Sequence, residues 1–100
     1  MIERTLLIKT RLGLHARAAA KLVRVASGFR SRVQLQRLDG QGAAGQSADA
    51  KSILSVLMLA ASCGTELRAS AEGSDEEAAI NAIDQLFAAG FGELDPESPR

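Results

Sequence analysis

Apolar residues alternate with polar ones in three separate stretches of this chain, and that spacing is the strongest constraint on its fold. In residues 2–10, Leu6 and Ile8 share one face, and residues 32–38 and 65–71 repeat the two-residue period. Side chains of a β-strand point alternately to opposite faces, so each stretch has one apolar and one polar face. A sheet built from them has one face in water, and helices cover only the other face.

Helix-like runs separate these strands. Residues 16–27 are rich in helix formers, and Gly28 is a natural terminator. Ser52 is the expected cap or first turn of a second helix, because serine oxygens accept hydrogen bonds from the free N–H groups of a helix start. This helix is predicted to run to about residue 62 and to be closed by Gly64.

A third helix is predicted near the end of the chain. Ser74 and Glu77 have the spacing of a capping box, with serine at the cap and glutamate three residues later. Gly90 is the expected end, and residues from Phe91 onward are expected to fray. The apolar stripe of this helix consists of Ile80, Ile83, Leu86 and Phe87.

The middle of the chain has the weakest pattern. Asp39-Gly40 is a typical hairpin turn, and the Gly/Ala-rich residues 41–47 are predicted to form only a weak strand beside a loop. No internal repeat or linker divides the 100 residues, a length that suits one domain. We therefore expect a single domain over residues 1–92 and a frayed tail over residues 93–100.

Composition narrows the classes of function. The chain has 12 basic and 12 acidic side chains, and this zero net charge argues against a nucleic-acid-binding protein. Cys63 is the only cysteine, so neither an intrachain disulfide nor a cysteine metal cluster can form. The longest apolar run, residues 56–61, is too short to cross a membrane. We expect a cytoplasmic domain with no metal site and no membrane insertion.

The only histidine lies where an extended run gives way to a helix, in Gly13-Leu14-His15-Ala16-Arg17. A helix start offers unpaired N–H groups and a positive dipole end, which favour a bound anion. A neutral imidazole nitrogen is a nucleophile near neutral pH, so His15 is placed to take up a phosphoryl group. The N–H groups of Ala16 and Arg17, and the Arg17 guanidinium, would then receive the phosphate. By spacing alone, His15 also fits a capping or surface histidine, and Arg17 a solvated helix residue.

Three segments resemble the HPr family, the histidine-containing phosphocarriers of the bacterial phosphotransferase system. Residues 13–17 look like the active-site signature of the family, and Ala50-Lys51-Ser52-Ile53 is similar to the segment that carries its regulatory serine. Residues 69–77 are similar to the last strand and its turn into the final helix. The three segments occur in the family's order, and the resemblance runs from about residue 2 to residue 90.

The resemblance implies an α+β fold, an open-faced β-sandwich of order βαββαβα, with a four-stranded antiparallel sheet and three helices on one face. It implies that His15 accepts a phosphoryl group from a phosphoenolpyruvate-dependent enzyme I and passes it to enzyme IIA-type proteins. Arg17 would stabilise the phosphate and Ala16 would donate its backbone N–H, without a cofactor. Such a protein is a phosphoryl-transfer intermediate rather than an enzyme with its own turnover.

Further positions follow from the same resemblance. Ser52 matches the regulatory serine, which implies an HPr kinase/phosphorylase as a partner, although serine is also simply a good helix cap. Leu54 and Leu57 match partner-contacting positions, or they fill the core. The basic residues expected to ring this surface and steer acidic partners are Lys51, Lys21 and Arg24, which otherwise form the wet sides of two helices.

The chain also departs from the family pattern. Ala18 stands where the family usually has proline directly after the active-site arginine, and the stretch between Gly40 and Ser52 is longer than in typical members. Residues 11–13 and 86–91 are similar to the nitrogen-related (NPr) branch, whereas Lys51-Ser52-Ile53 is closer to the sugar-system members. These departures leave a second function open: a regulatory protein-binding module of the same fold, switched by phosphorylation of His15 or Ser52.

Overall fold

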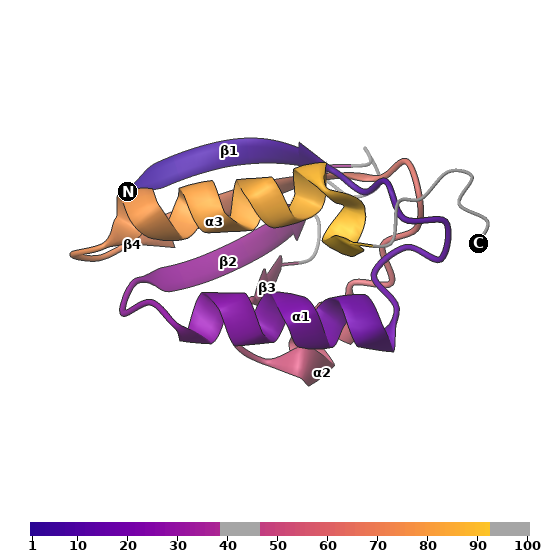
Figure 1. Cartoon of the computed structure of the whole chain (residues 1–100), viewed down its shortest axis with the longest axis horizontal. Helices are drawn as coiled ribbons and strands as arrows, with labels where there is room; N and C mark the ends of the chain where they lie inside the picture. The colour runs from indigo at the N-terminus through magenta and orange to yellow at the C-terminus, as the bar shows by residue number, and fades with distance from the viewer. Residues whose placement is uncertain (39–46, 93–100) are drawn as a thin grey trace.

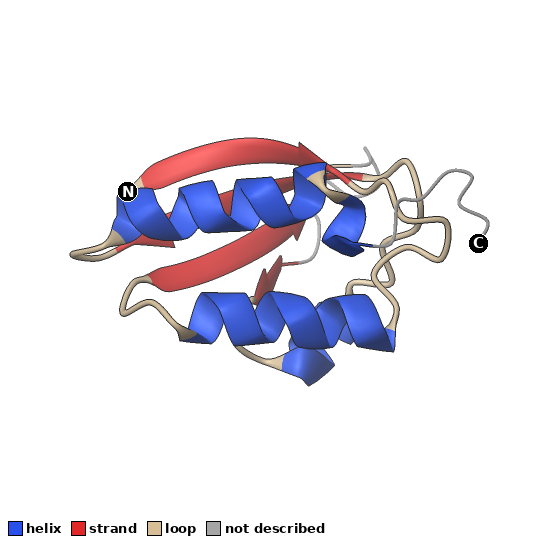
Figure 2. Cartoon of the chain, in the orientation of Figure 1, coloured by secondary structure: helices blue, strands red, loops and turns tan. Residues whose placement is uncertain are grey.

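A four-stranded antiparallel sheet with three helices on one of its faces forms the fold (Figure 1, Figure 2). The computed structural model describes residues 1–38 and 47–92. The strands are β1 (Ile2–Leu7), β2 (Arg32–Arg37), β3 (Ser47–Asp49) and β4 (Glu66–Glu72), in the spatial order β1-β4-β2-β3. The helices are α1 (Ala16–Ser27), α2 (Ile53–Met58) and α3 (Glu76–Ala88), followed by the 3₁₀ turn η1 (Gly90–Gly92). The predicted α+β open-faced sandwich is confirmed.

The alternating pattern places the core between the sheet and the helices. In the central strand β4, alternate residues Leu67, Ala69 and Ala71 are buried. The neighbouring β2 continues this apolar face, because Val33 lies opposite Ala71 and Leu35 opposite Ala69. Small alanines in the centre of the sheet leave room for larger helix side chains. Those side chains are Leu22 of α1 and Ile80, Ile83 and Phe87 of α3, all buried.

Several element boundaries differ from the predicted ones. The first strand ends at Leu7 rather than at residue 10. The second helix ends at Met58, four residues before the predicted end, because Leu59 closes it and Ala60 adopts a φ of 50° that cannot continue a helix. The described part of the middle segment forms a strand only at Ser47–Asp49. The predicted Asp39-Gly40 turn, most of the predicted weak strand and the predicted frayed tail lie outside the described residues.

The prediction that fraying begins at Phe91 is wrong. Phe91 is buried, and its ring packs edge-on against Phe87 with a centroid separation of 4.8 Å. The Lys21 ammonium on α1 donates a hydrogen bond of 2.7 Å to the Phe91 carbonyl oxygen. A buried aromatic ring and a charged donor therefore hold the chain in place just after α3.

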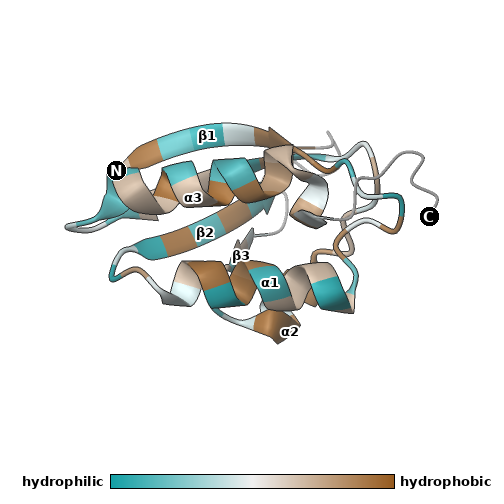
Figure 3. Cartoon of the chain, in the orientation of Figure 1, coloured by the Kyte–Doolittle hydropathy of each residue, from teal (hydrophilic) through white to brown (hydrophobic). Residues whose placement is uncertain are grey.

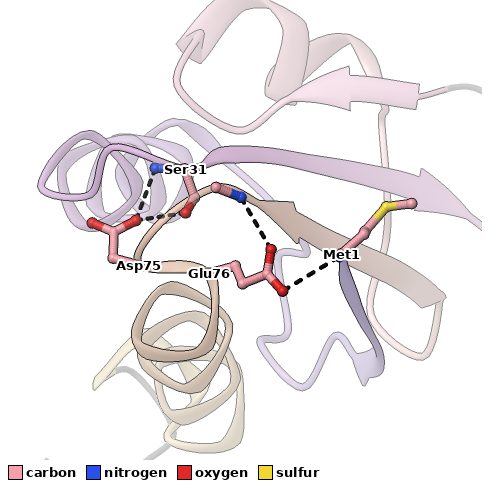
Figure 4. A network of polar contacts seen from close by, with 5 residues as sticks. Met1, Ser31, Asp75 and Glu76 are labelled. Carbon is pink, nitrogen blue, oxygen red and sulfur yellow. Dashed lines mark hydrogen bonds and ion pairs between the residues drawn. The ribbon is translucent and has the colours of Figure 1, made fainter.

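The start of α3 is tied to two distant segments (Figure 4), and the predicted capping box at Ser74 is wrong. The N-cap residue is Asp75, whose carboxylate accepts hydrogen bonds from the N–H groups of Arg30 and Ser31, both at 2.9 Å, and from the Ser31 hydroxyl. Glu76, rather than Glu77, turns back along the chain. Its carboxylate accepts from the Gly73 N–H at 3.1 Å and lies 3.3 Å from the amino group of Met1.

At the other end of the molecule, the connection between β1 and α1 packs against the connection between α2 and β4. The Leu14 N–H donates to the Ala61 carbonyl at 3.0 Å, and the Thr10 hydroxyl donates to the Gly13 carbonyl at 2.7 Å. Gly13 has a φ of 69°, and a Cβ on it would overlap the Ala61 carbonyl oxygen. Only glycine fits both the positive φ and the close approach. These contacts fix the chain that leads into α1.

Acid should remove a contribution of Asp75 to stability. The hydrogen bond from the Ser31 hydroxyl and that from the Arg30 N–H lower the pKa of Asp75 from 3.8 to about 2 in the folded protein. Folding therefore favours the carboxylate, so the contribution is fully present above the unfolded pKa and is lost as the pH falls through about 2. Urea unfolding at stepped pH should show the free energy of unfolding falling across this window.

Two variants separate this effect from general loss of charge. Asp75→Asn should flatten the pH dependence and lower stability at pH 7, because a neutral amide replaces an anion that accepts three hydrogen bonds. Glu77→Gln removes the same charge from an exposed side chain in the same helical turn and should keep the wild-type profile. In Asp75→Asn the free energy of unfolding will still depend on pH to some extent, since the Gly73 N–H also lowers the pKa of Glu76. Identical profiles for wild type and Asp75→Asn would contradict the assignment.

Gly13→Ala should destabilise the protein more than Gly64→Ala does. Both glycines have a positive φ, which costs an alanine about 1–2 kcal/mol. A Cβ on Gly64 meets no atom within 4 Å, whereas one on Gly13 also lies 2.8 Å from the Ser62 Cα. We expect an additional loss of about 1–3 kcal/mol for Gly13→Ala, the usual cost of overpacking. Urea denaturation of the two variants measures the difference, and equal losses would show that the connection yields without strain.

Candidate functional site

His15 is the N-cap residue of α1. Its backbone is extended (φ −76°, ψ 178°), and its carbonyl accepts the first helical hydrogen bond, from the Ala19 N–H, at 2.8 Å. The half-buried imidazole accepts through Nδ1 a hydrogen bond of 3.3 Å from the Arg17 N–H. Because Nδ1 is an acceptor, the proton of a neutral ring lies on Nε2. The predicted position of His15 at a helix start agrees with this structure.

The surroundings of His15 favour an anion. The first turn of α1 contains no acidic residue, so none of its own side chains places a carboxylate beside its N–H groups. Ala16 and Arg17 are both exposed, which leaves their side of the helix start open to solvent. N–H groups at a helix N-terminus and the guanidinium of an arginine in the same turn are donors suited to phosphate oxygens. The structure thus brings together a nucleophilic nitrogen and groups that can bind a phosphoryl group.

A second feature is the short helix α2, which is apolar over most of its surface (Figure 3). Only Val56 faces inward and is buried. Leu54 is 65% exposed and Leu57 is 36% exposed, so the interpretation of these two leucines as core residues is wrong. We call Ile53, Leu54, Leu57 and Met58, the four exposed apolar residues of this helix, the α2 patch.

Ser52 precedes the α2 patch as the N-cap residue of the helix. Its hydroxyl oxygen accepts a hydrogen bond of 3.2 Å from the Ser55 N–H, and the side chain is half-buried. The prediction that Ser52 is a helix cap is therefore confirmed. The same hydroxyl lies at the edge of an exposed apolar surface, next in sequence to Ile53.

Two of the three basic residues expected around this surface bind the protein's own main chain. The Lys51 ammonium donates to the Phe29 carbonyl at 2.8 Å, and the Lys21 ammonium donates to the Phe91 carbonyl. Lys21 is half-buried, so the prediction that it simply faces water is wrong. Arg24 and Arg17 are exposed on α1. Both lysines therefore have main-chain partners within the fold, whereas the two arginines are exposed.

Sequence reasoning missed Leu12, the most exposed large apolar residue of the described chain, at 76%. It lies in the turn closed by the hydrogen bond from the Gly13 N–H to the Thr10 carbonyl, three residues before His15. In the sequence, Leu12 is an isolated leucine between Arg11 and Gly13. Such a leucine also occurs in loops that bury it, so the sequence does not indicate its exposure.

Over residues 1–38 and 47–92, no three histidine, cysteine, aspartate or glutamate side chains converge as a group that could hold a metal ion. No helix in that part of the chain has the length and apolar character needed to cross a membrane.

Known proteins resemble this chain over nearly its whole length. The family model described as "PTS HPr component phosphorylation site" matches residues 2–89. A phosphocarrier protein HPr of Xylella fastidiosa is 43% identical over 93 residues, which are 93% of this chain and 98% of that protein. A phosphocarrier protein NPr of Proteus mirabilis is 41% identical over 90 residues, 90% of this chain and 94% of that protein. Overall identity therefore does not separate the two branches.

The solved structures agree with these relatives. A crystal structure of HPr from Thermoanaerobacter tengcongensis superposes with a TM-score of 0.83 and 41% identity, and covers 95% of this chain and 100% of that one. Sequence, fold and the histidine at the start of α1 lead to the same assignment. The chain belongs to the HPr family of phosphocarriers of the phosphotransferase system.

Proposed function

We propose that this phosphocarrier receives a phosphoryl group on Nδ1 of His15 from an enzyme I-like, phosphoenolpyruvate-dependent kinase and passes it to an enzyme IIA-type protein. The observation that carries the proposal is the acceptor role of Nδ1 at the start of α1, opposite the Arg17 N–H. The lone pair that accepts this hydrogen bond is the one that attacks phosphorus. Family membership supports the direction of transfer and the two classes of partner.

The transfer is a displacement at phosphorus. The Nδ1 lone pair of His15 forms the new N–P bond, while the bond between phosphorus and the donor breaks and its electron pair leaves with the donor. The Nε2 proton passes to water as the ring returns to neutrality. The Arg17 N–H, released from Nδ1, and the Ala16 N–H then donate to phosphate oxygens, with the Arg17 guanidinium adding charge. Passing the group to the acceptor reverses these steps.

The carrier must also bind two different partners, and the α2 patch is our proposed docking surface. Leu54 and Leu57 supply exposed apolar area that excludes water from a complex. Exposed Arg17 and Arg24 on the neighbouring helix steer acidic partners towards this face. Lys51 and Lys21 contribute charge while holding the carbonyls of Phe29 and Phe91 in place. The protein is proposed to work in the cytoplasm, where enzyme I-like kinases would meet it.

Ser52 is proposed as a regulatory site for a kinase similar to HPr kinase/phosphorylase. A phosphate on its hydroxyl would place about two negative charges at the edge of the α2 patch. Such charge is tolerated at a helix start, but it would repel acidic partners and add a desolvation cost to an apolar contact. Modification of Ser52 would therefore weaken partner docking while leaving the helix folded.

The first test is intact mass after incubation with phosphoenolpyruvate and enzyme I. Wild type should gain one phosphoryl group, which mild acid should remove because a phosphorus–nitrogen bond is acid-labile. His15→Ala should gain none, since the attacking nitrogen is gone. A phosphoryl group on His15→Ala would show that the phosphorylated residue is not His15. The test is repeated with an enzyme I that phosphorylates a control carrier and with the chain's own partner kinase. If wild type gains no phosphoryl group from either kinase, the regulatory binding module is favoured instead.

The docking surface has a matched control on the opposite face of the sheet. Leu54→Gln should raise the KM for phosphorylation by enzyme I about tenfold and leave kcat nearly unchanged, because it removes an apolar contact outside the reacting atoms. Leu7 is 44% exposed in β1, where its neighbour Leu6 faces the core, so it projects to the open face of the sheet. Leu7→Gln should leave both parameters unchanged. Equal effects of the two substitutions would argue against docking through α2.

A further inference from the structure

The backbone N–H of Ala18 lacks a partner in the described structure, although Ala18 is completely buried. Ala18 is the third residue of α1, and the first regular helical hydrogen bond comes one residue later, from Ala19 to the His15 carbonyl. Within residues 1–38 and 47–92, no atom accepts a hydrogen bond from the Ala18 N–H. A buried N–H without an acceptor costs free energy, so an acceptor that reaches it is favoured.

The direction of this N–H leads to His15. In the first turn of an α-helix, the unpaired N–H groups all point towards the N-terminus, where the side chain of the N-cap residue lies. The preceding donor, the Arg17 N–H, already contacts Nδ1 of His15. Ala18 is the next donor in the same turn, so both N–H groups face the space around that nitrogen.

A phosphoryl group on Nδ1 changes this arrangement. The lone pair of Nδ1 is then used for the bond to phosphorus, and the Arg17 N–H must find another acceptor. The phosphate supplies three oxygens with about two negative charges, enough for several donors at once. An anion among the N–H groups of a helix start is also favoured by the helix dipole.

We propose that the Ala18 N–H donates a hydrogen bond to the phosphoryl group on His15 and stabilises the phosphorylated form of this carrier. This inference rests on the proposed function and adds a donor to it. Proline, the residue usual at this position in the resemblance described above, has no N–H and cannot make the bond. Alanine therefore changes the carrier's affinity for its cargo through the backbone, without adding a functional side chain.

An exchange equilibrium tests the proposal without depending on any rate. Isotope-labelled wild type and unlabelled Ala18→Pro are mixed in equal amounts with catalytic enzyme I and limiting phosphoenolpyruvate, and intact mass gives the phosphorylated fraction of each. The phosphoryl group should favour wild type by about tenfold, as expected for loss of one hydrogen bond to a charged group. Ala18→Gly keeps the N–H, loses the methyl group and should share the phosphoryl group nearly equally with wild type.

A second readout uses wild type alone and does not require the proline variant to fold. In ¹H–¹⁵N correlation spectra, phosphorylation should move the Ala18 amide proton downfield together with that of Arg17, as charge-assisted hydrogen bonds form. An Ala18 signal that stays in place while that of Arg17 moves would overturn the inference, as would equal partition between wild type and folded Ala18→Pro. In both cases His15 is still phosphorylated, so the proposed function stands. Wild type that takes up no phosphoryl group would overturn both.

Discussion

The position of His15 depends on main-chain hydrogen bonds between two connections at one end of the sheet. Ile8 donates its N–H to the Thr65 carbonyl and accepts from the Gly64 N–H, at 3.0 and 2.8 Å, which extends the β1–β4 pairing beyond both strands. The bond from Leu14 to Ala61 continues this contact to the residue before the histidine. A reactive side chain is thereby placed on a short, rigid connection, although it belongs formally to a loop.

Much of the fold could be predicted because it depends on local pattern. Alternating residues such as Leu67 and Ala69 specify a strand with one buried face wherever they occur. The start of α3 could not be predicted in this way. Ser74 has the correct spacing for a capping box, but Asp75 makes contacts with Arg30 and Ser31, which are more than 40 residues away in sequence. Tertiary hydrogen bonds to a carboxylate outweigh a local preference for serine.

In the candidate site, too, the features set by local contacts could be predicted and those set by distant contacts could not. His15 and Ser52 cap the two helices whose starts they were predicted to mark, because a cap bonds to N–H groups two or three residues away. Lys21 was misjudged because its acceptor, the Phe91 carbonyl, lies 70 residues further along the chain. The end of α2 at Met58 could not be predicted, because the positive φ of Ala60, which follows the helix, has no residue-type signal. Alanine is an unusual residue in that conformation.

The contact between Lys21 and Phe91 also determines which end of the molecule a fused partner would occupy. It places the end of η1 beside α1, on the side of the fold where that helix begins, whereas the N-terminus lies at the opposite end near Glu76 (Figure 1). A fluorophore or purification tag attached through Met1 is therefore kept away from His15. The same label attached at Gly92 would lie on the His15 side of the fold, near the proposed docking surface, and its steric hindrance would be measured as weak partner binding.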